Sequence, residues 1–301
     1  MDNMVLRMEG LTKSYGRHRG VISLDLGIRH GEVFGYLGPN GAGKTTTIRT
    51  LLDFIRPTRG HASIFGLDTH RDSLAIHKRV GYLPGELVLY ENMTGAEVLR
   101  YLGHLRGGVS WNRVEELAKR LDSDLARPVK TLSHGNRQKI GLIAAFMHQP
   151  ELLMLDEPTL GLDPLVQQAF YQLLLEARAE GRTVFLSSHI LPEVERVCDR
   201  VGIIREGEII AVEDVAALKA RALRRLEIHF AQPVPPDAFA SITGVRDLTV
   251  ENSILRCTVM GSLDALVKAA AQFEVVNLIS HEPTLEEIFL AYYGGGGRDA
   301  A

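Results

Sequence analysis

Residues 38–45 read Gly-Pro-Asn-Gly-Ala-Gly-Lys-Thr, which matches the phosphate-loop pattern of glycines followed by lysine and threonine. Glycines let backbone N–H groups approach phosphate oxygens, Lys44 neutralises their charge, and Thr45 is suited to hold magnesium. A predicted strand at 32–37 runs into the loop and a predicted helix begins near Gly43, which is the context that this chemistry requires. The loop therefore predicts nucleoside triphosphate binding. It lacks the third glycine of a dinucleotide-binding loop.

Two adjacent carboxylates, Asp156 and Glu157, directly follow the apolar run at residues 152–155. Such a run predicts a buried strand, whose carboxyl end lies at the sheet edge where a phosphate loop must also lie. Asp156 is suited to bind magnesium, directly or through water. Glu157 is suited to polarise an attacking water as general base, a role whose loss typically costs about 10²–10⁴-fold in rate. The alternative is that both acids cap the following segment.

A third polar element, Leu-Ser-His-Gly-Asn-Arg-Gln at residues 132–138, opens a predicted helix shortly before that strand. Ser133 and Gly135 at a helix start make an anion site, because the first N–H groups of a helix are unpaired and its dipole is positive there. A capping serine followed by a glycine explains the pattern equally well. The order along the chain is more informative: phosphate loop, helical region, this element, the carboxylates, and then residues 160–163 and 187–189.

The elements that must position these residues follow from the hydrophobic pattern. Short apolar runs alternate with helical segments, which predicts an α/β fold with a mostly parallel sheet. Strands are expected at residues 4–9, 21–28, 32–37, 62–65, 151–155, 183–187 and 201–204. Residues 70–131 have a mostly helical pattern, so an inserted helical region is expected there.

The composition changes after residues 208–211, and a basic stretch at 219–225 leads into a segment with three prolines. We therefore expect a main domain at 1–219 and a small accessory domain at 220–301, with a flexible end at the glycine run 294–297. The order strand, helix, strand, strand, helix, strand suggests a ferredoxin-like α+β unit. These elements are expected at 226–230, 236–241, 245–250, 254–259, 262–272 and 273–280, with a last helix at 284–293.

The composition excludes several classes of protein. The 301 residues are 45% hydrophobic and 24% charged, which is typical of a folded globular protein rather than a disordered one. The 34 Lys and Arg against 37 Asp and Glu leave no basic surplus for binding nucleic acid. The longest apolar stretch, 140–147, is far shorter than the ~20 residues of a membrane span, and residues 1–10 lack the features of a signal peptide. Any membrane role must therefore come through a partner.

The ordered set closely resembles the nucleotide-binding subunits of ABC transporters, and within them the bacterial export-type subunits encoded apart from their membrane partner. The resemblance covers about residues 4–215, and residues 282–293 resemble the carboxyl end of the same subfamily. It implies a phosphate-loop ATPase core in which a mostly parallel sheet is joined by an antiparallel β subdomain and the helical insertion. It also implies ATP and Mg²⁺ as the bound groups.

The resemblance gives roles to further residues. Tyr15 looks like the aromatic that stacks on adenine, and Asp163 like the aspartate of the subunit-contact loop. His189 looks like the histidine that senses the γ-phosphate, so it is expected to act in catalysis with Lys44 and Glu157. The loop residues expected to contact nucleotide are Gly38, Pro39, Asn40, Gly41, Ala42, Gly43, Lys44, Thr45 and Thr46.

Ser133 and Gly135 correspond to the serine and second glycine of the family's signature sequence, which is usually LSGGQ. His134 and Asn136 depart from it. The resemblance implies a dimer, in which the nucleotide held by one subunit is covered by Ser133 and Gly135 of the other.

A second departure concerns the family's glutamine that touches magnesium and relays to the membrane partner. It would fall within residues 80–86, where this chain has no glutamine. Either Gly85 leaves the contact to water or Glu86 substitutes near the metal. The apolar residues at 87–93 either receive a helix of the membrane subunit or pack within the helical region.

The resemblance thus implies an ATPase that energises export of a small molecule or drug through a separate membrane permease. The subunit is expected as a homodimer, peripheral on the cytoplasmic face of the cell membrane and without a nucleic-acid partner. The alternatives are a soluble ATPase of the same superfamily that remodels ribosomes or DNA, and a non-enzymatic ATP switch. The chain has neither the two cassettes of translation relatives nor the long coiled coils of DNA-repair relatives.

Overall fold

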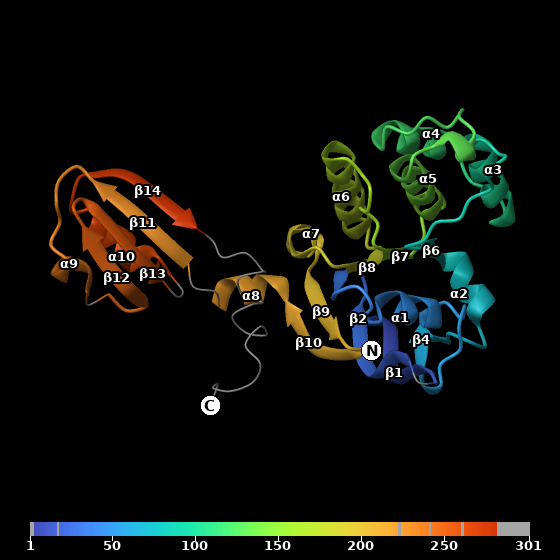
Figure 1. Ribbon diagram of the computed structural model, residues 1–301, viewed down its shortest axis with the longest axis horizontal. Helices are drawn as coiled ribbons and strands as arrows, with labels where there is room; N and C mark the ends of the chain where they lie inside the picture. Colours follow the sequence, from blue (N-terminus) through green and yellow to red (C-terminus); the bar gives the residue numbers. More distant parts are fainter. Residues whose placement is uncertain (1–2, 17, 222–223, 241, 260–261, 282–301) are drawn as a thin grey trace. The chain divides into compact units, whose positions relative to one another are not determined.

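The computed structural model describes residues 3–16, 18–221, 224–240, 242–259 and 262–281. The chain divides into two compact units, Met1–Glu213 and Asp214–Ala301. Figure 1 shows the elements of each. No helix in these described ranges is both long enough and apolar enough to cross a membrane.

A six-stranded sheet forms the centre of the first unit, in the order β10-β9-β3-β8-β7-β6. The pairs β3–β8, β3–β9, β6–β7 and β7–β8 are parallel. All residues of β3, β7 and β8 are buried, as in parallel sheets with both faces covered. The mostly parallel sheet expected from the apolar runs is confirmed. Its strands are β3 (Val33–Leu37), β6 (Val80–Leu83), β7 (Leu152–Asp156), β8 (Thr183–Ser188), β9 (Arg200–Arg205) and β10 (Glu208–Asp214).

Strand β6 corrects the expectation that residues 70–131 are mostly helical. It pairs in parallel with β7, from Val80 opposite Leu152 to Leu83 opposite Leu155. A run of four residues between two helical patterns cannot be assigned by periodicity, because a buried strand and a buried helical turn are then equally apolar. The inserted helices therefore begin beyond this strand.

A second sheet, antiparallel and four-stranded, has the order β2-β1-β4-β5. Its strands are β1 (Met4–Tyr15), β2 (His18–Arg29), β4 (Arg59–Ile64) and β5 (Leu67–Asp68). Its apolar face, helix α1 (Lys44–Leu51) and one face of the central sheet share one core, to which Leu6, Ile28, Ile48 and Met154 contribute. This core fixes the start of α1 against the central sheet, where the phosphate loop lies.

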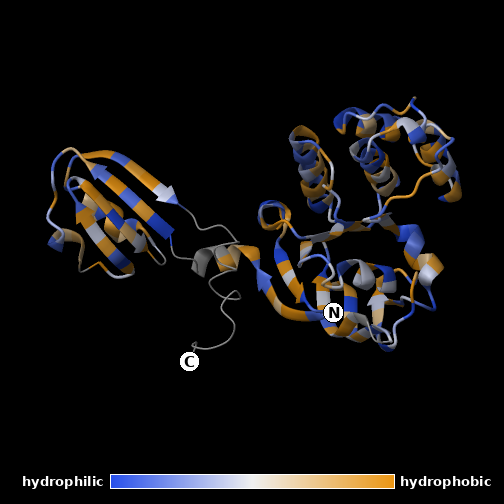
Figure 2. Ribbon diagram, in the orientation of Figure 1, coloured by the Kyte–Doolittle hydropathy of each residue, from blue (hydrophilic) through white to orange (hydrophobic). Residues whose placement is uncertain are grey.

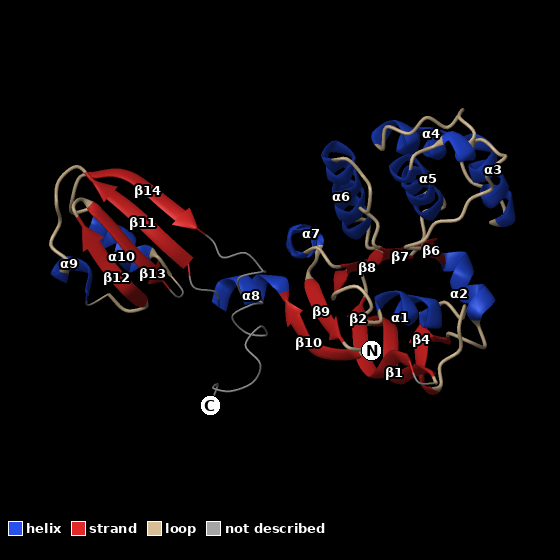
Figure 3. Cartoon of the chain, in the orientation of Figure 1, coloured by secondary structure: helices blue, strands red, loops and turns tan. Residues whose placement is uncertain are grey.

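The remaining helices of this unit lie on the central sheet or at its β6 end. Helices α3, α4 and α5 form a separate group beyond β6 and β7, as Figure 3 shows. Helix α3 begins with a capping box, in which Thr94 and Glu97 satisfy each other's backbone N–H groups. The helices are α2 (Ser73–Arg79), α3 (Gly95–Leu105), α4 (Trp111–Arg120), η1 (Val129–Thr131), α5 (His134–Phe146), α6 (Pro164–Ala179) and α7 (Leu191–Val197).

The second unit contains an antiparallel sheet in the order β12-β13-β11-β14, with helices α9 and α10. Hydrophobic and hydrophilic residues alternate along its strands (Figure 2), because only one face is buried. Phe230, Phe239 and Phe273 pack together on that face, with ring centroids 5.8–5.9 Å apart. The ferredoxin-like expectation is confirmed for the described elements. They are α8 (Val215–Arg221), β11 (Arg224–Phe230), α9 (Asp237–Ala240), β12 (Val245–Glu251), β13 (Ile254–Val259), α10 (Asp264–Ala270) and β14 (Val275–His281). The helix expected at 284–293 lies outside the described residues.

Candidate active site

The phosphate loop connects β3 to α1. Gly43 precedes the helix with φ at 113°, in the left-handed region that favours glycine, and it offers no side chain to the first helical N–H groups. These N–H groups are left for an outside acceptor, as at other anion-binding helix starts. Gly38 also lacks room for a side chain, because a Cβ there would lie 2.3 Å from the carbonyl oxygen of Ile204.

Lys44 lies on the first turn of α1 and is only 6% exposed. Its Nζ donates to the carbonyl oxygens of Gly38, at 2.5 Å, and Pro39, at 3.2 Å. The same Nζ lies 3.1 Å from Oε1 of Glu157. A buried ammonium is therefore held at the loop by two carbonyls and one carboxylate, and a phosphate group would offer it a stronger acceptor.

Asp156 ends strand β7 and is completely buried. Thr45 Oγ1 donates to its Oδ2 at 2.7 Å, and Ser187 Oγ from the neighbouring strand β8 donates to its Oδ1 at 2.5 Å. The loop threonine and the strand-end aspartate thus lie together, although 111 positions separate them in the sequence.

Glu157 has φ at 49°, an uncommon backbone conformation for a residue other than glycine. Its backbone N–H donates to the carbonyl oxygen of Ser187 at 3.2 Å. Its side chain lies between two cations or potential cations, because Oε1 faces Lys44 and Oε2 lies 2.8 Å from Nδ1 of His189. One carboxylate therefore connects the phosphate loop to the histidine.

A cavity of about 180 Å³ lies over this group. Its lining residues are Gly20, Asn40, Gly41, Gly43, Lys44, Thr45, Thr46 and Glu157. The loop residues expected from the sequence and the candidate general base thus share one cavity.

Tyr15 is not among the residues that line this cavity. It lies at the end of β1 and is 46% exposed, with Lys13 Nζ 5.2 Å from the ring centroid. Its ring is next to Gly20, a lining residue, because a Cβ on that glycine would lie 3.4 Å from Tyr15 Cδ2. The expected adenine-stacking residue is therefore at the edge of the cavity.

Ser133, Gly135 and Asp163 do not line the cavity either. Ser133 caps α5, where its side chain accepts from the N–H of Asn136 at 3.3 Å. Gly135 is held against the loop that precedes α6, since a Cβ there would lie 2.2 Å from the carbonyl oxygen of Gly161. A single chain thus keeps the start of α5 apart from Lys44.

Asp163 caps α6 by accepting from the N–H of Val166 at 3.0 Å. This hydrogen bond is the main reason why its pKa lies below the ordinary value. The carboxylate is 54% exposed, with Lys139 Nζ 3.8 Å away.

Gly85 lies beside Asp156, since a Cβ on this glycine would be 3.1 Å from Oδ2. Glu86 is exposed, and it has no ion pair in the part of the chain that the structure describes. The position of Gly85 next to this carboxylate favours a contact left to water.

Two buried polar residues near the site were not singled out from the sequence. Gln138 on α5 donates to the carbonyl oxygen of Pro158 at 3.2 Å and so connects this helix to the segment after Glu157. Its sequence signal is a polar residue near the start of a mostly apolar helix. Glu193 on α7 is 2% exposed and accepts from Ser188 Oγ at 2.6 Å.

Burial raises the pKa of Glu193 to about 7, and the Glu157 charge adds to this effect. Hydrogen bonds from Ser188 and Thr159 oppose it. The hydrogen bond from Ser188 to Glu193 fixes the side chain of the residue that precedes His189. No sequence pattern separates Glu193 from an exposed acid in the first turn of a helix.

The donor set at Thr45 and Asp156 fits a magnesium ion. Both offer hard oxygen ligands, and Mg²⁺ is usually bound through one or two carboxylates together with substrate phosphates and water. In the described residues, no group of three or more His, Cys, Asp or Glu is arranged to hold a metal by protein ligands alone.

Comparisons with known proteins show what this chain is similar to. The family described as "ABC transporter" matches residues 21–160. The bacitracin transport ATP-binding protein BcrA of Bacillus licheniformis is 34% identical, over 97% of this chain and 98% of its own length. The linearmycin resistance ATP-binding protein LnrL of Bacillus subtilis is 32% identical, over 98% of this chain and 100% of its own. A solved ATP-binding subunit of an ABC transporter is 31% identical with a TM-score of 0.64, covering 71% of this chain and 92% of that one.

Proposed function

The chain belongs to the ABC transporter family as an ATP-hydrolysing, ATP-binding subunit, and on this premise we propose that it energises export of an antibiotic or drug-like small molecule through a separate membrane permease. The full-length match to subunits named for bacitracin transport and linearmycin resistance supports this substrate class. These names do not favour a role in remodelling ribosomes or DNA.

The nucleotide binds, in this proposal, with its phosphates in the cavity over the phosphate loop. The first residues of α1 line this cavity, and Lys44 exchanges its contact with Glu157 for the β- and γ-phosphates. Tyr15 at the edge stacks on the adenine. ATP binding thus releases one oxygen of Glu157 from Lys44.

Thr45 and Asp156 are proposed to hold Mg²⁺, with Gly85 leaving room beside Asp156 for a coordinated water. When bound, the ion neutralises charge on the phosphate oxygens. Ser187 would keep Asp156 oriented through its hydrogen bond to Oδ1.

Glu157 is the proposed general base. Once Lys44 engages phosphate, Oε1 is free to accept a proton from the attacking water, while His189 keeps the carboxylate in place through Oε2. His189 is also proposed to contact the γ-phosphate, because its Nδ1 lies 2.8 Å from Oε2 of Glu157, which lines the cavity. The position of Glu157 between Lys44 and His189 is the observation that carries the proposed hydrolysis.

Ser133 and Gly135 are proposed to complete the site of a second copy of the chain. They lie at the start of α5, whose unpaired N–H groups and dipole favour an anion, yet they do not line their own chain's cavity. Asp163 would lie at the same contact between subunits. ATP then holds the two copies together, and hydrolysis removes the charge that held them.

The permease is proposed to place the dimer on the cytoplasmic face of the cell membrane. We assign residues 1–219 to the ATP-binding domain, with its helical subdomain within 70–131, and residues 220–301 to an accessory domain that braces or regulates the dimer.

Transport into inverted membrane vesicles tests the proposed function. Vesicles would contain the chain and the membrane protein encoded beside it, with bacitracin and linearmycin as test compounds. We expect ATP-dependent uptake with the wild-type chain and none with Glu157→Gln. Uptake that is absent, or identical in both, while the wild-type chain still hydrolyses ATP would reject export and leave the ATPase assignment standing.

A further inference from the structure

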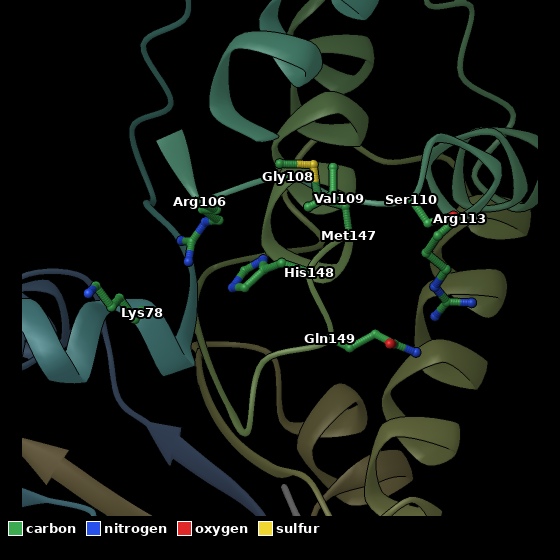
Figure 4. Close-up of a pocket in the computed structure, with 9 residues that line it drawn as sticks. All are labelled: Lys78, Arg106, Gly108, Val109, Ser110, Arg113, Met147, His148 and Gln149. Atoms are coloured by element: carbon green, nitrogen blue, oxygen red, sulfur yellow. The ribbon is translucent and has the colours of Figure 1, made fainter. Parts of the chain in front are cut away.

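A second and larger cavity, of about 520 Å³, lies in the first unit away from the phosphate loop. Figure 4 shows its lining side chains, which come from α2, from the turn between α3 and α4, from α4 itself, and from the segment after α5. Elements of the central sheet's edge and of the α3–α5 group therefore meet at one cavity, which the ATPase chemistry does not use.

Every titratable side chain that lines this cavity is basic. Lys78, Arg106 and Arg113 are permanent cations, His148 is the fourth group, and no carboxylate is among the lining residues. Arg113 is neutralised, because its guanidinium donates to both carboxylate oxygens of Glu116, at 2.8 and 2.9 Å. Lys78 and Arg106 have no ion pair among the described residues, so two positive charges at the cavity are uncompensated.

Arg106 is held in place although it has no acidic partner in the part of the chain that the structure describes. Its guanidinium donates to the carbonyl oxygens of His77 and Val80, each at 3.2 Å. Burial lowers its pKa, which is the sign of a cation that has lost water without gaining a counter-charge. The chain thus positions a guanidinium group at the cavity and leaves its charge for another partner.

His148 lies next to this guanidinium. Its Nε2 is 3.2 Å from the carbonyl oxygen of Val80, so this nitrogen carries the proton, while Nδ1 is buried. Burial, with a smaller contribution from the Arg106 charge, lowers the pKa of His148 to about 4, so the ring is neutral at physiological pH. A bound anion would stabilise the protonated ring and so raise this pKa.

We propose that this cavity binds a phosphate-bearing anion with two or more negative charges, held by Lys78 and Arg106 against the ring of His148. Guanidinium and ammonium groups bind phosphate oxygens through charge-assisted hydrogen bonds, and the volume exceeds that of one phosphate group. The anion, either free in solution or the headgroup of a phospholipid, would tie α2 and the edge of the central sheet to the α3–α5 group.

Inorganic pyrophosphate is the probe for the free anion. The full chain is first saturated with ADP, which fills the phosphate loop, and the histidine rings are then followed by NMR against pH. We expect pyrophosphate to raise the pKa of His148 from about 4, saturably, by one unit or more. Lys78→Gln and Arg106→Gln should each weaken this binding about tenfold.

Lys119→Gln is the matched control, since this lysine lies on α4 outside the cavity lining. It should bind pyrophosphate as the wild-type chain does. Lys78 is exposed, and its replacement should leave ATP turnover of the free subunit unchanged, which confirms folding.

Flotation with vesicles of phosphatidylcholine, with and without phosphatidic acid, tests the lipid source. Binding to phosphatidic acid that Lys78→Gln weakens, without a response of His148 to pyrophosphate, assigns the site to a lipid headgroup; the reverse assigns it to a free anion. No response of His148 and no vesicle binding, or binding that neither Lys78→Gln nor Arg106→Gln changes, would overturn the proposal.

Discussion

The phosphate loop of one chain and the start of α5 of a second copy are proposed to bind the same nucleotide, and the two regions differ in how their polar groups are paired. At the phosphate loop, Lys44 and Asp156 are buried and the polar groups contact one another: Lys44 contacts Glu157, Glu157 contacts His189, and Thr45 donates to Asp156. At the start of α5, Ser133 only caps its own helix, and Gly135 contacts the loop before α6.

The two regions therefore suit different steps of the proposed mechanism. A network of paired polar groups is pre-organised, so it suits the chemical step, which tolerates little displacement. At the start of α5, the N–H groups that Ser133 does not cap and the helix dipole stay available for an outside anion. Changes in the first region should therefore affect hydrolysis most, and changes in the second should affect association and stability.

Glu157→Gln should have the largest effect. It removes the proton acceptor while leaving the loop and Lys44 in place, so phosphate release should fall about 10²–10⁴-fold while ATP binding persists. Phosphate release and fluorescent-nucleotide binding measure the two properties. Glu115→Gln, which changes an exposed acid on α4, is the control and should hydrolyse ATP normally. Unchanged release in Glu157→Gln would mean that Glu157 is not the base.

Glu193→Gln should change how stability depends on pH. The pKa of Glu193 is about 7 in the folded chain against an ordinary value of 4.5, so the folded state binds the extra proton between these values. The contribution of Glu193 to the free energy of unfolding is fully present below pH 4.5 and is lost as pH rises through 7. The variant should lack this loss, which amounts to about 3 kcal/mol over the window.

Urea unfolding at pH 5 and pH 8 measures that difference, with Glu115→Gln as the control. Equal pH dependence in Glu193→Gln and the wild-type chain would show that Glu193 is not a buried acid in the folded state.

Ser133→Ala should have the smallest effect on stability. It removes the side-chain cap of α5, which is worth about 1 kcal/mol. Ser110→Ala is the matched control, because Ser110 precedes α4 without a side-chain capping hydrogen bond, so its loss should cost less. Thermal unfolding of the two variants measures the difference, and an equal loss in both would contradict the capping geometry.

The sequence predicts the parts of the site that are local. Residues 38–45 carry their own pattern of glycines, lysine and threonine, and the acids after β7 lie where a buried strand must end. The four residues of β6 could not be assigned, because a short apolar run has no period that separates strand from helix.

Contacts between distant segments could not be predicted from the sequence either. The burial of Glu193, the contact between Lys44 and Glu157, and the position of Gly85 beside Asp156 all depend on tertiary packing. An acid in a first helical turn or a glycine after a strand has the same sequence signature whether it is exposed or enclosed. The resemblance to a family supplied the roles of Tyr15 and His189, which are single residues without a local pattern.

Mixing two inactive variants tests the shared site most directly. Lys44→Ala removes the charge of one region, and Ser133→Trp blocks the other, so each variant alone should hydrolyse almost no ATP. In an equimolar mixture, half of the dimers are mixed, and each of these has one site with Lys44 from one chain and Ser133 from the other. Phosphate release should recover to about a quarter of the wild-type rate if the sites act independently. No recovery in dimers that are shown to be mixed would contradict a nucleotide held between two copies of this chain.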